Sequence, residues 1–291
     1  MSINLGGVYT STTDAAIAGF DTEVKQVYQG SGVLRPAVRV KAGVTGQQYA
    51  FRKMGAGMAY QQTSSAEAIT PNDTSHAKIF ATLTNWRIGD FTDIFDQAET
   101  NIDERSELAK MIGFALGRCE DQLIINALNA ASGYAGTVAS GYGGTNTGLT
   151  ADKLRHAKRY LVQNQAKGGD HFLATTAIGL ETALAEIEIT SADYQTMRVL
   201  VDADINDKKA FGFSFKIIEN RLEGGLPTGS TSVSVCFAWD KMSTGLAVAL
   251  EPSTRVDYIP VNNAWLSQAH FMGGAAVIDA LGVVPVMVYG T

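Results

Sequence analysis

Four histidines are the side chains most able to do chemistry near neutral pH, and no shared spacing joins them. His76, His156, His171 and His270 form no HxxxH or HxH pair, and none has a carboxylate at a pairing distance in the sequence. A histidine that acts as a general base or a metal ligand needs such partners. We therefore expect all four to be solvated or structural residues.

Acidic residues offer two further candidate sites. Asp202, Asp204 and Asp207 are spaced like the start of a calcium-binding loop, but the glycine at position six and the glutamate at position twelve are missing. A surface turn is the simpler interpretation, and weak cation binding stays open. The acids between residues 93 and 104 are spaced as helix-start acids rather than as paired catalytic carboxylates.

Sequence motifs for cofactors and nucleophiles are missing. The glycine-rich run at residues 141–148 has no Lys-Ser/Thr ending, and the chain contains no GxSxG or Rossmann fingerprint. Cys119 and Cys236 have neither disulfide nor metal spacing. The sequence therefore predicts no catalytic residue, no cofactor and no metal, and it favours a protein that is not an enzyme.

The composition favours a chain that hides much of its surface against neighbours. Charged residues make up 18% of the 291, below the roughly 25% of an average soluble protein. The net charge of −6 argues against a dedicated nucleic-acid binder. The helix predicted at 150–167 carries a basic stripe that consists of Lys153, Arg155, Lys158 and Arg159. The first interpretation of this stripe is a solvated face, and the second is a patch that touches packaged DNA. We expect neither a signal peptide nor a membrane span, and a reducing cytoplasm as the place of synthesis.

One long helix is expected to position much of the chain. Residues 101–133 repeat apolar side chains at three- and four-residue steps, with Asn101 as the cap and Gly133 as the stop. At about 1.5 Å per residue this rod spans on the order of 45 Å, which is typical of a structural subunit rather than a compact enzyme. The predicted core face consists of Leu108, Met111, Ile112, Ala115, Cys119 and Leu123, and continues through Ala127 and Ala130.

Two glycines lie inside this predicted helix. Gly113 and Gly117 each cost up to about 1 kcal/mol relative to alanine in a helix interior. One interpretation is that another backbone passes close to this side of the helix. The other is a tolerated glycine at an exposed position.

The residues before the long helix predict an arm and an extended flap. Residues 1–14 read as a polar arm and 15–29 as a short amphipathic helix. Two strands at 38–41 and 48–53 flank a turn at 43–46. Residues 54–74 are small and polar with little burial pattern, and an alternating strand follows at 78–87.

The residues after the long helix predict an α+β arrangement. A loop at 134–148 leads to a helix at 150–167, capped by Thr150, with Leu154, Ala157, Leu161 and Val162 on one face. The further elements are short strands and one helix. We expect the helix at 178–187 and strands at 172–174, 213–218, 233–239, 245–249, 255–258 and near the chain's end.

This order of elements resembles the major capsid protein of tailed bacteriophages, the Hong Kong 97-type fold. The likeness lies in residues 20–24 with Tyr28, in 41–52, 66–70 and 88–93, in 121–128 of the long helix, and in the repeat Leu154, Ala157 and Leu161. Residues 255–258 and 274–277 resemble its closing strands. The resemblance implies an α+β capsid fold with an N-terminal arm, an extended E-loop, a peripheral domain with a spine helix, and an axial domain.

The resemblance also implies a domain division and a set of partners. The expected protein is a virion component, assembled in the host cytoplasm, that forms pentamers and hexamers of an icosahedral head around double-stranded DNA. Its partners are copies of itself, a separate scaffolding protein, a portal, and packaged DNA through weak non-specific contact. The expected divisions are 1–35 for the arm, 36–88 for the strand and E-loop, 89–150 for the peripheral domain, 151–255 for the axial domain, and 256–291 for strands returning to the peripheral domain.

The E-loop is the expected site of contact between subunits. Met54, Met58 and Tyr60 would dock on a neighbour, or they pack under their own loop. Some family members link an E-loop lysine covalently to a neighbour, but residues 54–77 contain no lysine, so we expect no cross-link. The alternatives are an encapsulin-like compartment shell, an enzyme whose site is not visible in the sequence, and a trimeric tail or fibre protein.

Overall fold

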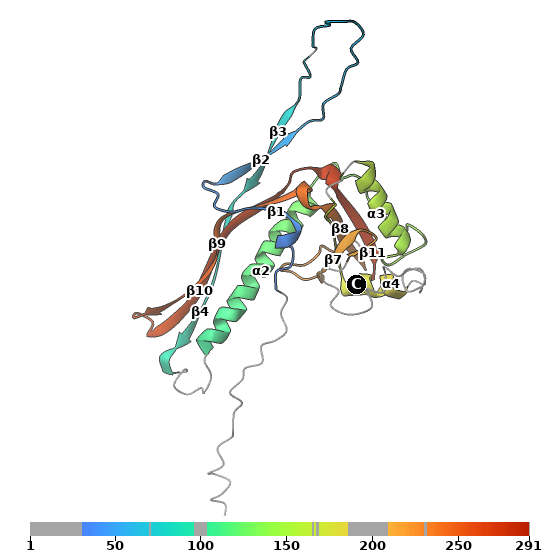
Figure 1. The fold of residues 1–291 in the computed structure, drawn as a ribbon. Helices are drawn as coiled ribbons and strands as arrows, with labels where there is room; N and C mark the ends of the chain where they lie inside the picture. The colour runs from blue at the N-terminus through green and yellow to red at the C-terminus, as the bar shows by residue number, and fades with distance from the viewer. Residues whose placement is uncertain are drawn as a thin grey trace, which may run out of the picture.

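The computed structural model describes residues 31–69, 71–95, 104–164, 166, 169–185, 209–229 and 232–290. The expected arm and its helix, the Asn101 cap and the Asp202–Asp207 acids lie outside the described residues. The described elements form two lobes joined along a long helix, with a narrow extension on one side (Figure 1).

A four-stranded sheet lies beside the long helix α2 (Glu104–Ala130) in Figure 1. The strand order is β1-β9-β10-β4, with β1 parallel to β9 and the other pairs antiparallel. Strands β9 and β10 form one long hairpin, and their pairing is irregular between His270 and Gly273. The bounds are β1 (Arg39–Lys41), β4 (Thr84–Asp93), β9 (Thr244–Ile259) and β10 (Ala264–Val277).

A five-stranded mixed sheet forms the other lobe. Its order is β11-β8-β5-β7-β6, with β5 and β7 parallel. Helix α3 (Ala151–Gln163) and helix α4 (Ala177–Ala185) lie beside this sheet in Figure 1. The strand bounds are β5 (His171–Thr175), β6 (Lys209–Ala210), β7 (Phe213–Ile217), β8 (Val233–Asp240) and β11 (Val283–Tyr289). Short 3-10 helices occur at η1 (Arg35–Ala37), η3 (Lys241–Ser243) and η4 (Ala280–Gly282). Helices together with separate, largely antiparallel sheets confirm the predicted α+β class.

The third sheet is the two-stranded extension. Strands β2 (Gln48–Met54) and β3 (His76–Thr82) pair antiparallel, and Gly55 N donates to Ser75 O at 2.8 Å just beyond them. The intervening residues 55–75, called here the projecting loop, extend away from both lobes (Figure 1). The base of the extension packs on the four-stranded sheet through Phe51, Ala81 and Leu83.

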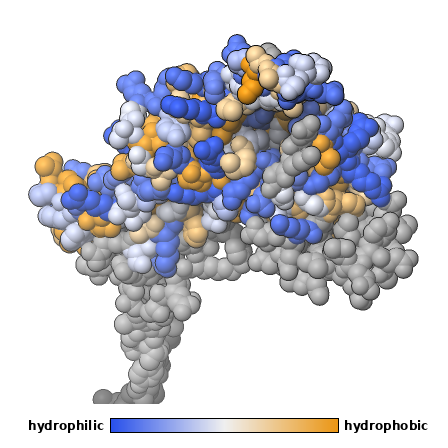
Figure 2. Space-filling model, turned by 45° about the horizontal axis from the view of Figure 1, so that its top comes forward, coloured by the Kyte–Doolittle hydropathy of each residue, from blue (hydrophilic) through white to orange (hydrophobic). Residues whose placement is uncertain are grey.

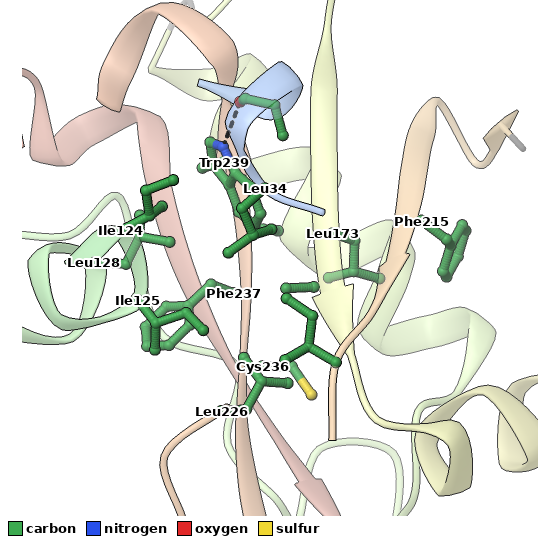
Figure 3. Packing of buried hydrophobic residues seen from close by; sticks show 14 of the residues in the cluster. Leu34, Ile124, Ile125, Leu128, Leu173, Phe215, Leu226, Cys236, Phe237 and Trp239 are labelled. Carbon is green, nitrogen blue, oxygen red and sulfur yellow. Dashed lines mark hydrogen bonds between the residues drawn. The ribbon is translucent and has the colours of Figure 1, made fainter. Parts of the chain in front are cut away.

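The main core extends from α2 through both larger sheets to α3 and α4. Ile112 and Leu116 are buried in its first half, and Ile124, Ile125 and Leu128 in its second half. At about 100° per residue, Ile112 and Ile124 point about 120° apart around the helix. Figure 3 shows the second group beside Phe237, Leu226 and Trp239, so the helix buries one side and then a different one.

Several sequence expectations about the strands and helices need correction. The strand predicted at 78–87 is two strands in different sheets, β3 and β4, which meet at Leu83. The strands at 245–249 and 255–258 are one continuous β9. The predicted strands around the 43–46 turn do not pair with each other, because β1 joins β9 and β2 joins β3. Val162 is exposed rather than buried, because it lies beside Leu161 on the outer side of α3.

The end of the chain differs from the expected division as well. Strand β10 returns to the sheet beside α2, but β11 pairs with β8 in the five-stranded sheet. The described residues 256–290 are therefore divided between the two lobes. Non-local pairing decides this, because β10 pairs with β9 and β4 while β11 pairs with β8.

Candidate intersubunit surfaces

Within the part of the chain that the structure describes, the apolar side chains of the projecting loop are mostly exposed. Met58 is 75% exposed and Ile69 is 93% exposed, and Met54 and Tyr60 are also mostly exposed. The loop does have internal order, because Glu67 Oε2 accepts hydrogen bonds from Thr63 N at 2.8 Å, from Thr63 Oγ1 and from Ser64 N. These bonds lower the pKa of Glu67, so the carboxylate stays ionised at the tip. The alternative that Met54, Met58 and Tyr60 pack under their own loop does not fit this structure, because all three side chains are mostly exposed.

A cavity lies on the four-stranded sheet, where the pairing of β10 is irregular. Its volume is about 420 Å³, and it is lined by Asn85, Trp86, Arg87, Leu250, His270, Phe271 and Met272. The walls are largely apolar, while Arg87 and His270 are cross-strand partners in β4 and β10. Sequence reasoning missed this cavity, because its two sides come from segments about 180 residues apart.

Exposed aromatic and aliphatic side chains also occur at the far end of the same sheet. Phe91 and Tyr258 are partly exposed, and Val261, in the turn between β9 and β10, is 93% exposed. Tyr258 packs against Trp265, with ring centroids 5.4 Å apart. Figure 2 shows hydrophobic side chains at the left end of the molecule, where Figure 1 places this turn. Large exposed apolar patches mark surfaces that contact other proteins.

The predicted core face of α2 is only part of what the helix buries. Ile112, Ala115 and Cys119 are buried, and Leu108, Met111 and Leu123 are half-buried. Ala130 is exposed, and α2 ends there, three residues before Gly133. Desolvation raises the pKa of the Cys119 thiol to about 12, in keeping with an unreactive core side chain.

The two helix glycines differ in their surroundings. A Cβ added at Gly117 would lie 2.7 Å from Gly32 N and 3.2 Å from Gly32 Cα. A Cβ at Gly113 would have no heavy atom within 4 Å. The backbone crossing that the sequence suggested therefore lies at Gly117, within this chain, while Gly113 faces open space.

The basic stripe on α3 is not one solvated face. Lys153 is fully buried, and its Nζ donates to Thr147 O at 2.7 Å, Met287 O at 2.9 Å and Ser140 O at 3.1 Å. Desolvation lowers the pKa of Lys153 to about 8. The expectation of a solvated lysine is wrong, because this position of α3 faces the 134–148 loop and β11.

The other residues of the stripe have partners within the chain. Arg155 pairs with Asp152 at 2.8 Å, and Lys158 Nζ lies 2.5 Å from His171 Nδ1. His171 itself is buried, and its Nε2 lies 2.8 Å from Ala166 O, which is a structural role. The described residues contain no group of three His, Cys, Asp or Glu side chains placed to share a metal ion. Within the same ranges, none of the helices has the length and hydropathy of a membrane span.

Comparison with known proteins identifies the family. Residues 12–288 match the family model described as phage capsid protein. The chain belongs to this family. It is therefore a structural protein of the virion, and the sequence resemblance to tailed-phage capsid proteins is confirmed. A search of curated proteins found no match.

Solved structures show the same fold for this capsid protein. The capsid of Ralstonia phage GP4 superposes with a TM-score of 0.72 at 9% identity, covering 100% of this chain and 98% of the other. The capsid of cyanophage P-SCSP1u gives 0.68 at 13% identity, covering 96% and 95%. The capsid of the native GTA particle gives 0.66 at 16% identity, covering 98% and 100%. At these identities the likeness establishes the fold.

Proposed function

We propose that this capsid protein assembles into the pentamers and hexamers of a closed icosahedral head that encloses double-stranded DNA. The observation that carries the proposal is the projecting loop, whose apolar side chains Met54, Met58, Tyr60 and Ile69 stay mostly exposed among the described residues. Exposing such residues on a long extension costs solubility unless another surface covers them. Copies of the same chain are the partners that a shell supplies.

We further propose that the loop acts as an E-loop and docks on the sheet cavity of a neighbouring copy. Met54, Met58 and Tyr60 would enter the cavity or pack at its rim. The charges agree with this partner: residues 54–77 contain Glu67 and Asp73 but no lysine or arginine. The cavity carries the cation Arg87 beside its apolar walls. Apolar contact would supply affinity, and opposite charges would favour this docking over others.

Cysteine pairing tests the docking directly. Met58→Cys combined with Leu250→Cys should give a disulfide-linked ladder of subunits when assembled particles are oxidised. The native thiols give little background, because Cys119 and Cys236 are buried with pKa values raised to about 12 and about 11. The matched control pairs Met58→Cys with Leu222→Cys, a fully exposed residue of the other lobe, and should give no ladder. A ladder from the control alone would contradict the docking.

Electron microscopy of the purified protein tests the proposal as a whole. Closed particles with five-fold and six-fold capsomers, containing DNA when taken from lysates, are expected. A scaffolding protein and a portal should copurify with immature particles. A stable monomer at high concentration would contradict the proposal, and particles filled with cargo enzymes would favour a compartment shell instead.

A further inference from the structure

One face of the four-stranded sheet carries only small side chains where the extension packs on it. Strands β9 and β10 pair there so that Gly245 lies opposite Ala276, and Ala247 lies opposite Gly274. Directly paired residues, and residues two apart in a strand, share one face of a sheet. These four residues therefore form a single patch, called here the platform.

The opposite face of the same strands carries larger side chains. Leu246 and Val248 alternate with the platform residues and are fully buried in the main core. Neither platform glycine has a positive φ, so the backbone conformation at Gly245 and Gly274 would accept other residues. Space for a neighbouring segment, rather than conformational freedom, is therefore what the two glycines supply.

The first glycine makes room for a ring of β2. A Cβ added at Gly245 would lie 2.5 Å from Phe51 Cζ and 2.8 Å from each Phe51 Cε. Phe51 is 2% exposed, and its ring meets the Tyr49 ring edge-on, with centroids 4.9 Å apart. The guanidinium carbon of Arg39 lies 6.0 Å from the centre of the Phe51 ring. The Phe51 ring therefore rests directly on the Gly245 backbone.

The second glycine makes room for the backbone at the end of β3. A Cβ added at Gly274 would overlap Thr82 O and lie 2.8 Å from Thr82 C. Ala81 and Leu83, on either side of Thr82, are buried in the cluster that joins the extension to the sheet. Glycine inside a strand often marks such a close approach of another backbone. Both strands of the extension thus contact the platform at a glycine.

An ion pair holds the extension at a third point. Lys53 Nζ lies 2.8 Å from Asp279 Oδ1. Asp279 follows β10, and the same oxygen accepts a hydrogen bond from Leu281 N at 3.1 Å, so the carboxylate is held at the start of η4. Lys53 lies two residues beyond Phe51 in β2 and therefore points to the same side of the extension. Three separate contacts, one of them ionic, hold the base of the extension.

We propose that the two platform glycines and the Lys53–Asp279 pair fix the direction in which the projecting loop leaves the two lobes. The β2–β3 ladder continues from this base to the pair Met54 and His76, so the loop starts from an ordered stem. The direction is a property of the single chain. Its consequence rests on the proposed function, because the direction then selects which surface of a neighbouring copy the loop reaches.

A small displacement at the base gives a larger one at the tip. A methyl group at Gly245 must raise Phe51 by about 1 Å to restore an ordinary contact of roughly 3.5 Å. Lys53 lies about 7 Å along β2 from Phe51, so this step tilts the extension by about 8°. Ser65 lies ten residues beyond Gly55, and an extended chain of that length spans about 33 Å. The tip should therefore move by about 5 Å.

Electron–electron double resonance on the full-length, unassembled protein measures this movement. One spin label is attached at Ser65→Cys in the loop. The second is attached at Val162→Cys on α3 or at Val261→Cys in the β9–β10 turn, and all three positions are exposed. Figure 1 places α3 and this turn at opposite ends of the two lobes, so the two distances report movement towards either end. The native thiols of Cys119 and Cys236 are buried and take little label.

Each label pair in the otherwise unchanged protein should give one narrow distance distribution. Gly245→Ala should shift the mean of at least one distance by about 5 Å. Gly113→Ala is the matched control, because its methyl group has no heavy atom within 4 Å, and it should shift neither distance. Lys53→Met should broaden both distributions, while Lys53→Arg keeps the ion pair and should leave them narrow.

Two results would overturn the proposal. Broad distributions in the otherwise unchanged protein would show that the base does not fix the loop. Unchanged distances in a folded Gly245→Ala variant would show that the platform does not set the direction. If Gly245→Ala fails to fold, Lys53→Met decides, since distributions as narrow as before would refute the role of the ion pair. Failure of the proposed function is a separate result: a shifted loop in subunits that still form normal particles would contradict docking of the loop, not its direction.

Discussion

The crossing at Gly117 gives a sharp test, because Gly113 on the same helix is a matched control. Alanine favours a helix interior by up to about 1 kcal/mol over glycine at either position. At Gly113 the added methyl has no heavy atom within 4 Å. We therefore expect Gly113→Ala to stabilise the protein by about 0.5–1 kcal/mol.

Gly117→Ala should act in the opposite direction. Its Cβ would lie 2.7 Å from Gly32 N, well inside the roughly 3.5 Å of optimal contact, so residues 32–34 must move. Movement weakens two hydrogen bonds to Asp121, each worth about 1.5–3 kcal/mol to a charged group. After the gain in helix propensity, a net loss of about 3 kcal/mol is expected.

Urea unfolding of both variants, followed by tryptophan fluorescence in the unassembled protein, measures the difference. The free energy of unfolding should differ by about 4 kcal/mol between the two alanine variants. Equal stabilisation by both substitutions would refute the close crossing at Gly117. Equal destabilisation would mean that helix propensity and local packing at Gly113 have been misjudged.

Three further predictions concern other parts of the chain. Gly113→Leu should leave the subunit folded but prevent particle formation, if a neighbouring copy approaches this open side of α2; normal particles by electron microscopy would contradict it. Wild-type particles heated in detergent should run as monomers on a gel, because residues 54–77 contain no lysine, and covalent oligomers would disprove this. Lys153→Met should destabilise the fold by about 2–4 kcal/mol, since three carbonyls lose a donor. The folded protein holds Lys153 at a pKa of about 8 against 10.5 unfolded, so wild-type stability should gain from a rise in pH between those values, and the variant should lack that gain.

Local sequence signals were enough for the elements that depend on near neighbours. The Thr150 cap predicts the start of α3, and the hydroxyl does accept from Lys153 N at 3.3 Å. The small, polar residues 54–74 predict a long excursion between two strands, which is what β2 and β3 enclose. The order of the elements was then enough to predict the α+β class and the capsid family, because proteins with this fold keep the order of elements even when few residues are identical.

Candidate contact residues could be predicted only in part. Composition predicts Met58 and Tyr60 as contact residues, since apolar side chains in a polar excursion need some partner; their exposure agrees with this, and the contact itself stays a prediction. The cavity that we propose to receive them could not be found, because Arg87 and Leu250 come together only through pairing of distant strands with β10. Asp121 carried a signal that was missed: a carboxylate among the apolar positions of a helix implies a buried donor.

The sequence by itself determined the long helix α2, the capped helix α3, the extension formed by β2 and β3, and the lack of a catalytic motif. It could do so because hydrophobic periodicity and turn residues act over a few neighbouring positions. Tertiary structure alone decided that α2 buries two different sides, that Lys153 lies inside, and that β11 leaves the sheet of β10. It also decided that Gly117 faces Gly32 while Gly113 faces open space. The local sequence around a glycine, a lysine or an apolar strand does not specify which distant segment will contact it. Those contacts form only when the whole chain packs.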